Sequence, residues 1–192
     1  MRFLVRLVPL NSDRATALPS VRDVAASLGA RAVNPKWTSQ GVLEIDLFVS
    51  SRLDFEVLVA ALAPVGKVVL KKDLRGPPPF LSREQAVQEW VGLFNSERFW
   101  EAHEVLESVW RVAEGDEKKL LQGLILLCAA FVHGQKGEEE VALGILRRAL
   151  PLLVWSHRTY YEVEVAGIRE RVGRMVAEGS LSVFAVSRRP AG

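Results

Sequence analysis

In the first 75 residues, segments with two different spacings of apolar side chains alternate along the chain. Apolar side chains at every second position predict strands, and apolar side chains three or four positions apart predict helices. The clearest strand is GVLEIDLFVS at residues 41–50, where apolar side chains alternate with Glu44 and Asp46. The predicted strands lie at residues 2–10, 31–39, 41–50 and 67–74, and the predicted helices at residues 18–29 and 53–66.

The order strand, helix, strand, strand, helix, strand predicts a ferredoxin-like βαββαβ domain at residues 1–75. Its first helix should bury an apolar stripe made of Leu18, Val21, Val24, Ala25 and Leu28. The sheet face opposite the core should present Glu44 and Asp46. An RNA-recognition sheet presents aromatic side chains there instead, so the pattern favours a docking or dimerisation module over an RNA-binding one.

The segment RGPPPF at residues 75–80 marks a change of pattern. Three consecutive prolines lack backbone donors and favour an extended conformation, so neither a helix nor a central strand can pass through them. We therefore expect a stiff proline linker at residues 76–81.

Almost all of the chain after this linker has helical periodicity. Ser82 and Gln85 have the spacing of a capping box at the start of the first helix. From Leu120 to Val132, Gln122 is the only polar side chain, so this helix should be central. The sequence thus predicts an α+β protein in which an all-helical bundle at residues 82–178 follows the first domain. The tail, residues 179–192, alternates again and could add a strand to the first sheet.

Composition and charge narrow the class of protein. The chain has 192 residues, of which 49% are hydrophobic and 25% charged, as in ordinary globular domains. Residues 1–79 carry eleven Lys/Arg against seven Asp/Glu, and residues 80–192 carry fourteen against sixteen, so neither part has the strong positive field that nucleic-acid binding favours. No segment reaches the roughly 18 apolar residues of a membrane span. The single cysteine, Cys128, excludes an internal disulfide and is consistent with the cytoplasm.

Candidate chemistry gathers in FWEAHEVLESVW, residues 99–110. Helical winding places His103 and Glu107 on one face with Trp100 and Trp110 as apolar walls. An antiparallel hairpin with residues 117–134 would bring Gln122 level with Glu107. The predicted polar cluster comprises His103, Glu107 and Gln122, with Glu104 and Arg111 on its edge. His133 lies eleven residues from Gln122, roughly 16 Å along a helix, and is a separate, secondary candidate.

These residues carry a resemblance to a known family. FNSERFWEAHEVLESVWR, followed by LLQGLILLCAAFVHGQKG and ALGILRRAL, is similar to the helical family called domain of unknown function 309. The resemblance covers about residues 86–176, with Val141 and Pro151 as departures. It implies a compact helical bundle and brings no activity with it. The matching positions are Phe99, Glu101, Ala102, His103, Glu104, Leu106, Glu107, Trp110, Leu121, Gln122, Gly123 and His133.

The sequence leaves three interpretations of the polar cluster open. Glu107 can be a buried hydrogen-bond acceptor for His103 or Gln122 that specifies how the two helices pack. His103 and Glu107, four residues apart, can instead bind a divalent metal, since HEVLE resembles the HExxH helix of zinc peptidases with Glu107 in place of the second histidine. They can also form an acid/base pair in a small-molecule, hydrolase-like pocket, although no nucleophile accompanies them.

A binding or scaffolding module is favoured over an enzyme. We expect Glu107 to be buried between the two helices. Cofactor and partner stay open, a homo-oligomer included.

Overall fold

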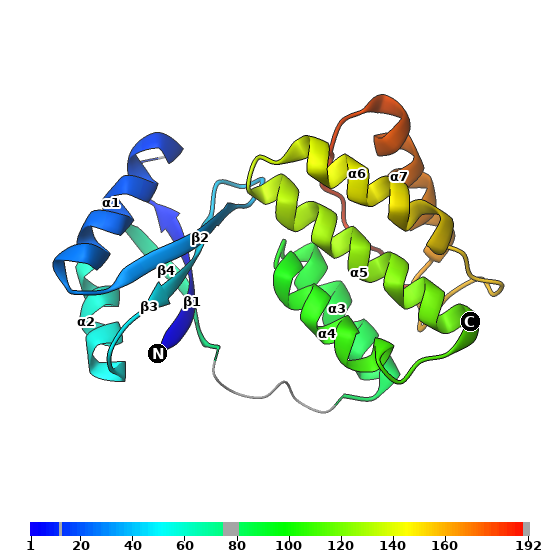
Figure 1. Cartoon of the computed structure of the whole chain (residues 1–192), viewed down its shortest axis with the longest axis horizontal. Helices are drawn as coiled ribbons and strands as arrows, with labels where there is room; N and C mark the ends of the chain where they lie inside the picture. The colour runs from blue at the N-terminus through cyan, green and yellow to red at the C-terminus, as the bar shows by residue number, and fades with distance from the viewer. Residues whose placement is uncertain (12, 75–80, 190–192) are drawn as a thin grey trace. The chain divides into compact units, whose positions relative to one another are not determined.

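The computed structural model describes residues 1–11, 13–74 and 81–189 of the chain. These residues form an α+β protein with two compact units, Met1–Pro77 and Pro78–Gly192, as Figure 1 shows. The predicted proline linker at residues 76–81 lies outside the described residues except for Leu81, so the domain boundaries stay a prediction.

The first unit is a four-stranded antiparallel sheet with two helices. Its strand order is β2-β3-β1-β4, and the elements follow one another as predicted. Side chains of both helices share one core with Phe3, Val5 and Leu7 of the sheet. The element bounds are β1 (Arg2–Pro9), α1 (Arg14–Ser27), β2 (Arg31–Trp37), β3 (Leu43–Phe48), α2 (Arg52–Ala61) and β4 (Gly66–Asp73).

The first helix differs from its prediction at both ends. It begins at Arg14, earlier than expected, because the Asp13 side chain accepts a hydrogen bond from the Ala15 amide at 2.9 Å. It ends at Ser27, and Leu28 is 41% exposed rather than part of the buried stripe. The reason is Gly29, whose φ of 69° turns the chain out of the helix just beyond Leu28.

The carboxylates of Glu44 and Asp46 are not presented to solvent, which corrects the expectation of an open acidic face. Their residues are 2% and 3% exposed. The Lys36 ammonium lies 2.5 Å from Glu44 Oε1, and the Arg2 guanidinium lies 2.6 Å from Asp46 Oδ2. Asn34 also donates a hydrogen bond to Asp46 Oδ2 at 2.9 Å. Alternation indicates which face a side chain occupies, but long basic side chains on neighbouring strands decide whether it is covered.

The second unit is built around one central helix. α5 (Gly115–Gln135) packs against α4 (Phe99–Trp110) and α6 (Glu139–Ala149), as predicted from its apolar sequence, and Figure 1 shows it running between them. The other elements are α3 (Arg83–Asn95), a short 3₁₀ turn (Leu150–Leu152) and α7 (Val165–Glu178). Pro151 lies in the 3₁₀ turn, beyond the end of α6, so it does not bend that helix.

Local sequence explains where the first of these helices begins. Ser82 accepts a hydrogen bond from the Gln85 amide, and the Gln85 side chain accepts one from the Ser82 amide, which is the predicted capping box. Within the described part of the chain, none of the helices has the length and apolar character needed to cross a membrane.

The described part of the tail adds no strand to the first unit's sheet, which corrects another expectation. Residues 180–189 run extended along the helical unit instead. The Asn95 side chain donates to the Val186 carbonyl at 3.0 Å and accepts from the Val186 amide at 2.7 Å. The Phe184 ring lies 5.5 Å from the Phe94 ring and 5.9 Å from the Phe131 ring. The alternation predicted an extended conformation correctly, but apolar contacts with the helices determine its location.

Gly66 provides a test of the packing between β1 and β4. A methyl group at this position would lie 2.5 Å from Leu7 Cδ2 and 2.5 Å from the Val8 carbonyl oxygen. We expect Gly66→Ala to lower the free energy of unfolding by about 1–3 kcal/mol in thermal or urea unfolding. Gly92→Ala is the control, because nothing lies within 4 Å of the added methyl group and helix α3 should gain up to ~1 kcal/mol. Equal destabilisation of both variants would contradict the packing.

Cys128 provides a pH test. Burial raises the pKa of its thiol from 9.0 to about 12. Unfolded chains therefore lose this proton first, so the stability contribution is complete below about pH 9 and is lost as the pH rises further. We expect the free energy of unfolding to fall with pH by up to about 1.4 kcal/mol per unit more in the native protein than in Cys128→Ala. Urea unfolding between about pH 8 and 10.5 measures both slopes, and parallel slopes would refute the assignment.

Candidate functional site

The predicted polar cluster lies at the border of the apolar face of α4. Phe99, Ala102 and Leu106 are fully buried in the helical core. His103 and Glu107 each follow one of these buried positions by one residue and are half-buried. One residue is a 100° turn of the helix, so their side chains emerge where the contact with α5 ends. The two ionisable groups therefore stand beside the apolar stripe rather than within it.

His103 is the most enclosed member of the cluster. Its side chain is 17% exposed, and its ring stacks on Trp100 with 5.6 Å between centroids and 6° between planes. Its Nδ1 atom lies 3.8 Å from Glu104 Oε1. Within the described residues this buried nitrogen has no hydrogen-bond partner. A buried polar atom without a partner calls for an explanation, such as a water molecule or an ion.

Glu107 is less buried than predicted. Its side chain is 35% exposed, and its Oε2 atom lies 3.7 Å from the Arg111 guanidinium on the same helix. Among the described residues, no hydrogen bond joins Glu107 to His103 or Gln122. The prediction assumed that Glu107 points at α5, but the buried positions on either side of it are Leu106 and Val109, which lie in the core that residues of α5 share. The expected packing role of Glu107 is therefore not realised.

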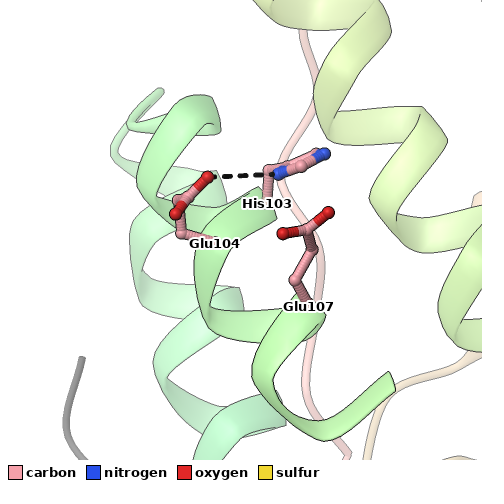
Figure 2. A group of neighbouring side chains, drawn as sticks. All are labelled: His103, Glu104 and Glu107. Carbon is pink, nitrogen blue, oxygen red and sulfur yellow. Dashed lines mark ion pairs between the residues drawn. The ribbon is translucent and has the colours of Figure 1, made fainter. Parts of the chain in front are cut away.

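The three side chains of Figure 2 converge. His103, Glu104 and Glu107 each offer one ligand atom, and these atoms lie within 4.8 Å of one another. Figure 2 shows the Glu107 carboxylate pointing along α4 toward the His103 ring, with Glu104 approaching the ring from the other side. Glu104, expected only at the edge, thus joins the two residues that the sequence nominated as metal ligands.

The remaining predicted residues divide between the border and the surface. Gln122 is half-buried on α5. Trp110 packs against the core, and its Nε1 atom is buried without a hydrogen-bond partner among the described residues. Trp100 is 41% exposed and the Arg111 side chain 72% exposed, so neither closes a pocket. His133 contacts Glu138 through its Nδ1 atom. His133 is therefore separate from the α4 cluster, as its distance of eleven residues from Gln122 along the helix predicted.

Two polar interactions escaped the sequence analysis. Glu101 is buried, and the Arg98 guanidinium donates to both of its carboxylate oxygens at 2.7 Å. The first glutamate of EAHE is therefore an internal ion-pair partner, which its three-residue spacing from Arg98 could have indicated. Tyr160 donates its hydroxyl to Glu117 at 3.0 Å, and burial together with this carboxylate raises the pKa of the phenol. These two residues are 43 positions apart, so no local pattern signals their contact.

Comparison with known proteins identifies the helical part. Residues 87–145 match the family described as "Domain of unknown function (DUF309)". A crystal structure of a conserved hypothetical protein from Thermus thermophilus is 33% identical, and the match covers 47% of this chain and 95% of that one with a TM-score of 0.42. No curated protein matches the chain.

The difference between Glu107 and Glu101 can be measured. Glu107→Gln removes only a half-exposed ion pair, so we expect the free energy of unfolding to change by less than about 1 kcal/mol. Glu101→Gln leaves the Arg98 guanidinium without its buried carboxylate and should cost about 3 kcal/mol. Urea unfolding of the two variants against the native protein provides the comparison. A cost above ~2 kcal/mol for Glu107→Gln would restore the packing role.

Proposed function

We propose that the helical unit, whose residues 87–145 match the DUF309 family, is a binding module that holds a divalent transition-metal ion at His103, Glu104 and Glu107. The description of that family assigns no activity. The observation that carries this proposal is the convergence of three ligand atoms, which lie within 4.8 Å of one another. In addition, the buried Nδ1 atom of His103 lacks a hydrogen-bond partner among the described residues.

The donor set matches the chemistry of first-row divalent ions. One imidazole nitrogen and two carboxylate oxygens suit Zn²⁺, Mn²⁺ or Fe²⁺ better than a thiolate-selective ion. Ligands about 2.1 Å from a metal ion lie roughly 3.0–3.4 Å from one another, so ligand atoms up to 4.8 Å apart must draw together by up to about 1.5 Å. The exposed carboxylates of Glu104 and Glu107 can make this adjustment through their rotamers, because neither is held by a buried contact.

The stacking of His103 on Trp100 supports the same proposal. A histidine that binds a metal must hold one ring orientation, and the neighbouring indole restricts the rotation of the imidazole. The proximity of Glu104 keeps a negative charge beside the ring, and this charge favours a bound cation. All three ligands come from one helix, so the remaining coordination positions face water and are open to a ligand or to a partner's side chain.

This arrangement supports binding better than catalysis. The proposed ligands lie at a half-exposed helix border, whereas an active site usually encloses its substrate in a pocket. The hydrolase-like alternative requires a pocket formed around His103, and the exposure of Trp100 and Arg111 does not favour one. We therefore retain a binding or scaffolding role, with the metal as the feature that a partner would recognise.

The first test is metal titration of the purified full chain. Isothermal titration with Zn²⁺ and Mn²⁺ should give one site per chain in the native protein, with Zn²⁺ bound more tightly than Mn²⁺. His103→Ala and Glu107→Gln should each weaken binding by about tenfold or more, because each removes a ligand. In thermal unfolding, the ion should stabilise the native protein and should not stabilise either variant.

His133→Ala is the matched control, because His133 is also half-exposed and contacts a carboxylate but lies outside the three-residue set. It should keep native affinity. Equal loss of binding in His133→Ala, or stoichiometric binding retained in His103→Ala, would place the metal elsewhere. Absence of binding in the native protein would overturn the metal proposal.

A further inference from the structure

The side of α4 that faces away from the helical core carries a continuous stripe of side chains. This α4 outer stripe consists of Trp100, Glu104, Glu107 and Arg111. Spacings of four, three and four residues place its members within an arc of about 60° on the helix. The buried Ala102 lies on the opposite side of the helix. Two of the three proposed metal ligands therefore belong to a surface that the fold itself leaves uncovered.

Trp100 is the apolar member of this stripe. It is 41% exposed, whereas the other tryptophans of the helical unit belong to the helical core or pack against it, namely Trp90, Trp110 and Trp155. Exposed aromatic side chains are enriched at protein–protein contacts, because a partner can remove their large rings from water. The Trp100 ring stacks on His103, so this apolar surface adjoins the proposed metal ligands.

The stripe is complementary to itself when its direction is reversed. Arg111 stands at the end opposite Trp100, eleven residues or roughly 16 Å away along the helix, and most of its side chain is exposed. In an antiparallel pair of α4 helices, Arg111 of one copy therefore meets Trp100 of the other. A guanidinium over an indole face is a favourable cation–π contact. The same alignment places Glu104 of one copy opposite Glu107 of the other.

These facing carboxylates require a cation between them. Glu104 and Glu107 of two copies bring four negative charges together, and like charges repel one another at short distance. Two divalent ions, one at each set of His103, Glu104 and Glu107, supply four positive charges and balance them. Each ion gains a ligand in return, because one helix provides three ligands and a tetrahedral site takes four.

We propose that a second copy of this chain completes the metal site, with two α4 helices packed antiparallel along their outer stripes and two divalent ions shared between them. Each ion is held by His103, Glu104 and Glu107 of one copy and by a carboxylate of the other. This inference rests on the proposed metal function. Four stripe residues per copy are far fewer than the roughly 20 residues a side of a stable interface, so the dimer depends on the ions.

The first test is analytical ultracentrifugation of the full chain, with the zinc content measured in the same samples. In the presence of a chelator, the native protein should sediment as a monomer. With one equivalent of Zn²⁺ per chain, it should sediment as a dimer that holds two ions, and excess chelator should restore the monomer. His103→Ala should stay monomeric with Zn²⁺, because it lacks one of the ligands.

A pair of substitutions tests the antiparallel alignment in the Zn²⁺-loaded protein. Trp100→Lys places an ammonium group opposite Arg111 of the other copy, and Arg111→Glu places a carboxylate on the indole of Trp100. Each should weaken dimerisation by about tenfold or more. The double variant should recover most of the loss, because the new ammonium then faces the new carboxylate of the other copy. The two positions are too far apart within one chain for this recovery to arise inside a monomer.

Helix α6 provides the matched controls, because Val141 and Arg147 are also an exposed apolar and an exposed basic residue. Val141→Lys and Arg147→Glu should dimerise like the native protein. Native protein that binds one Zn²⁺ per chain but stays monomeric would overturn the shared site and leave the metal proposal intact, whereas absence of Zn²⁺ binding would overturn both. A dimer that persists in chelator, or a double variant that does not recover, would contradict the metal-bridged antiparallel pair.

Discussion

The packing of aromatic rings around Phe94 is the interaction on which the rest of the helical unit depends. The Phe94 ring lies 5.0 Å from that of Phe99, 5.6 Å from that of Phe131 and 5.5 Å from that of Phe184. It thereby joins α3 to α4, to α5 and to the tail. Ring pairs at these separations add to the stabilisation that burial alone provides. Phe99 begins the helix that carries the α4 cluster, so the same contacts also position the proposed metal ligands.

Polar groups in this unit have different roles according to their distance from that core. Glu101 is buried and neutralised by Arg98, so it stabilises the fold. Glu104 and Glu107 lie within two positions of buried residues in the sequence, yet their carboxylates are accessible to solvent and can change rotamer. The burial of His103 is intermediate between that of Glu101 and those of Glu104 and Glu107. Most of its ring is enclosed, and two carboxylates lie nearby. A ligand that needs both a fixed nitrogen and adaptable oxygens finds them together at such a border.

Much of the architecture could be predicted from the sequence, because it depends on local periodicity. Alternation identified the strands, and the apolar sequence from Leu120 to Val132 identified the central helix. The α4 cluster could be nominated because its members are close in the chain. The degree of burial of its side chains could not be predicted, since a helical rotation of one residue separates Leu106 in the core from Glu107 at the border. The placement of the tail also depended on Asn95, which is 91 residues from Val186.

The covered carboxylates of β3 have a consequence for how the first sheet assembles. Glu44 pairs with Lys36 on one neighbouring strand, and Asp46 pairs with Arg2 on the other. A slip of β3 by one residue would move both carboxylates to the face occupied by Ile45 and Leu47 and would separate them from their cations. Such a misaligned sheet would bury two unpaired charges, which is far costlier than a lost apolar contact. The ion pairs therefore specify the strand register. They make incorrect registers unfavourable even where their net contribution to the stability of the correct register is small.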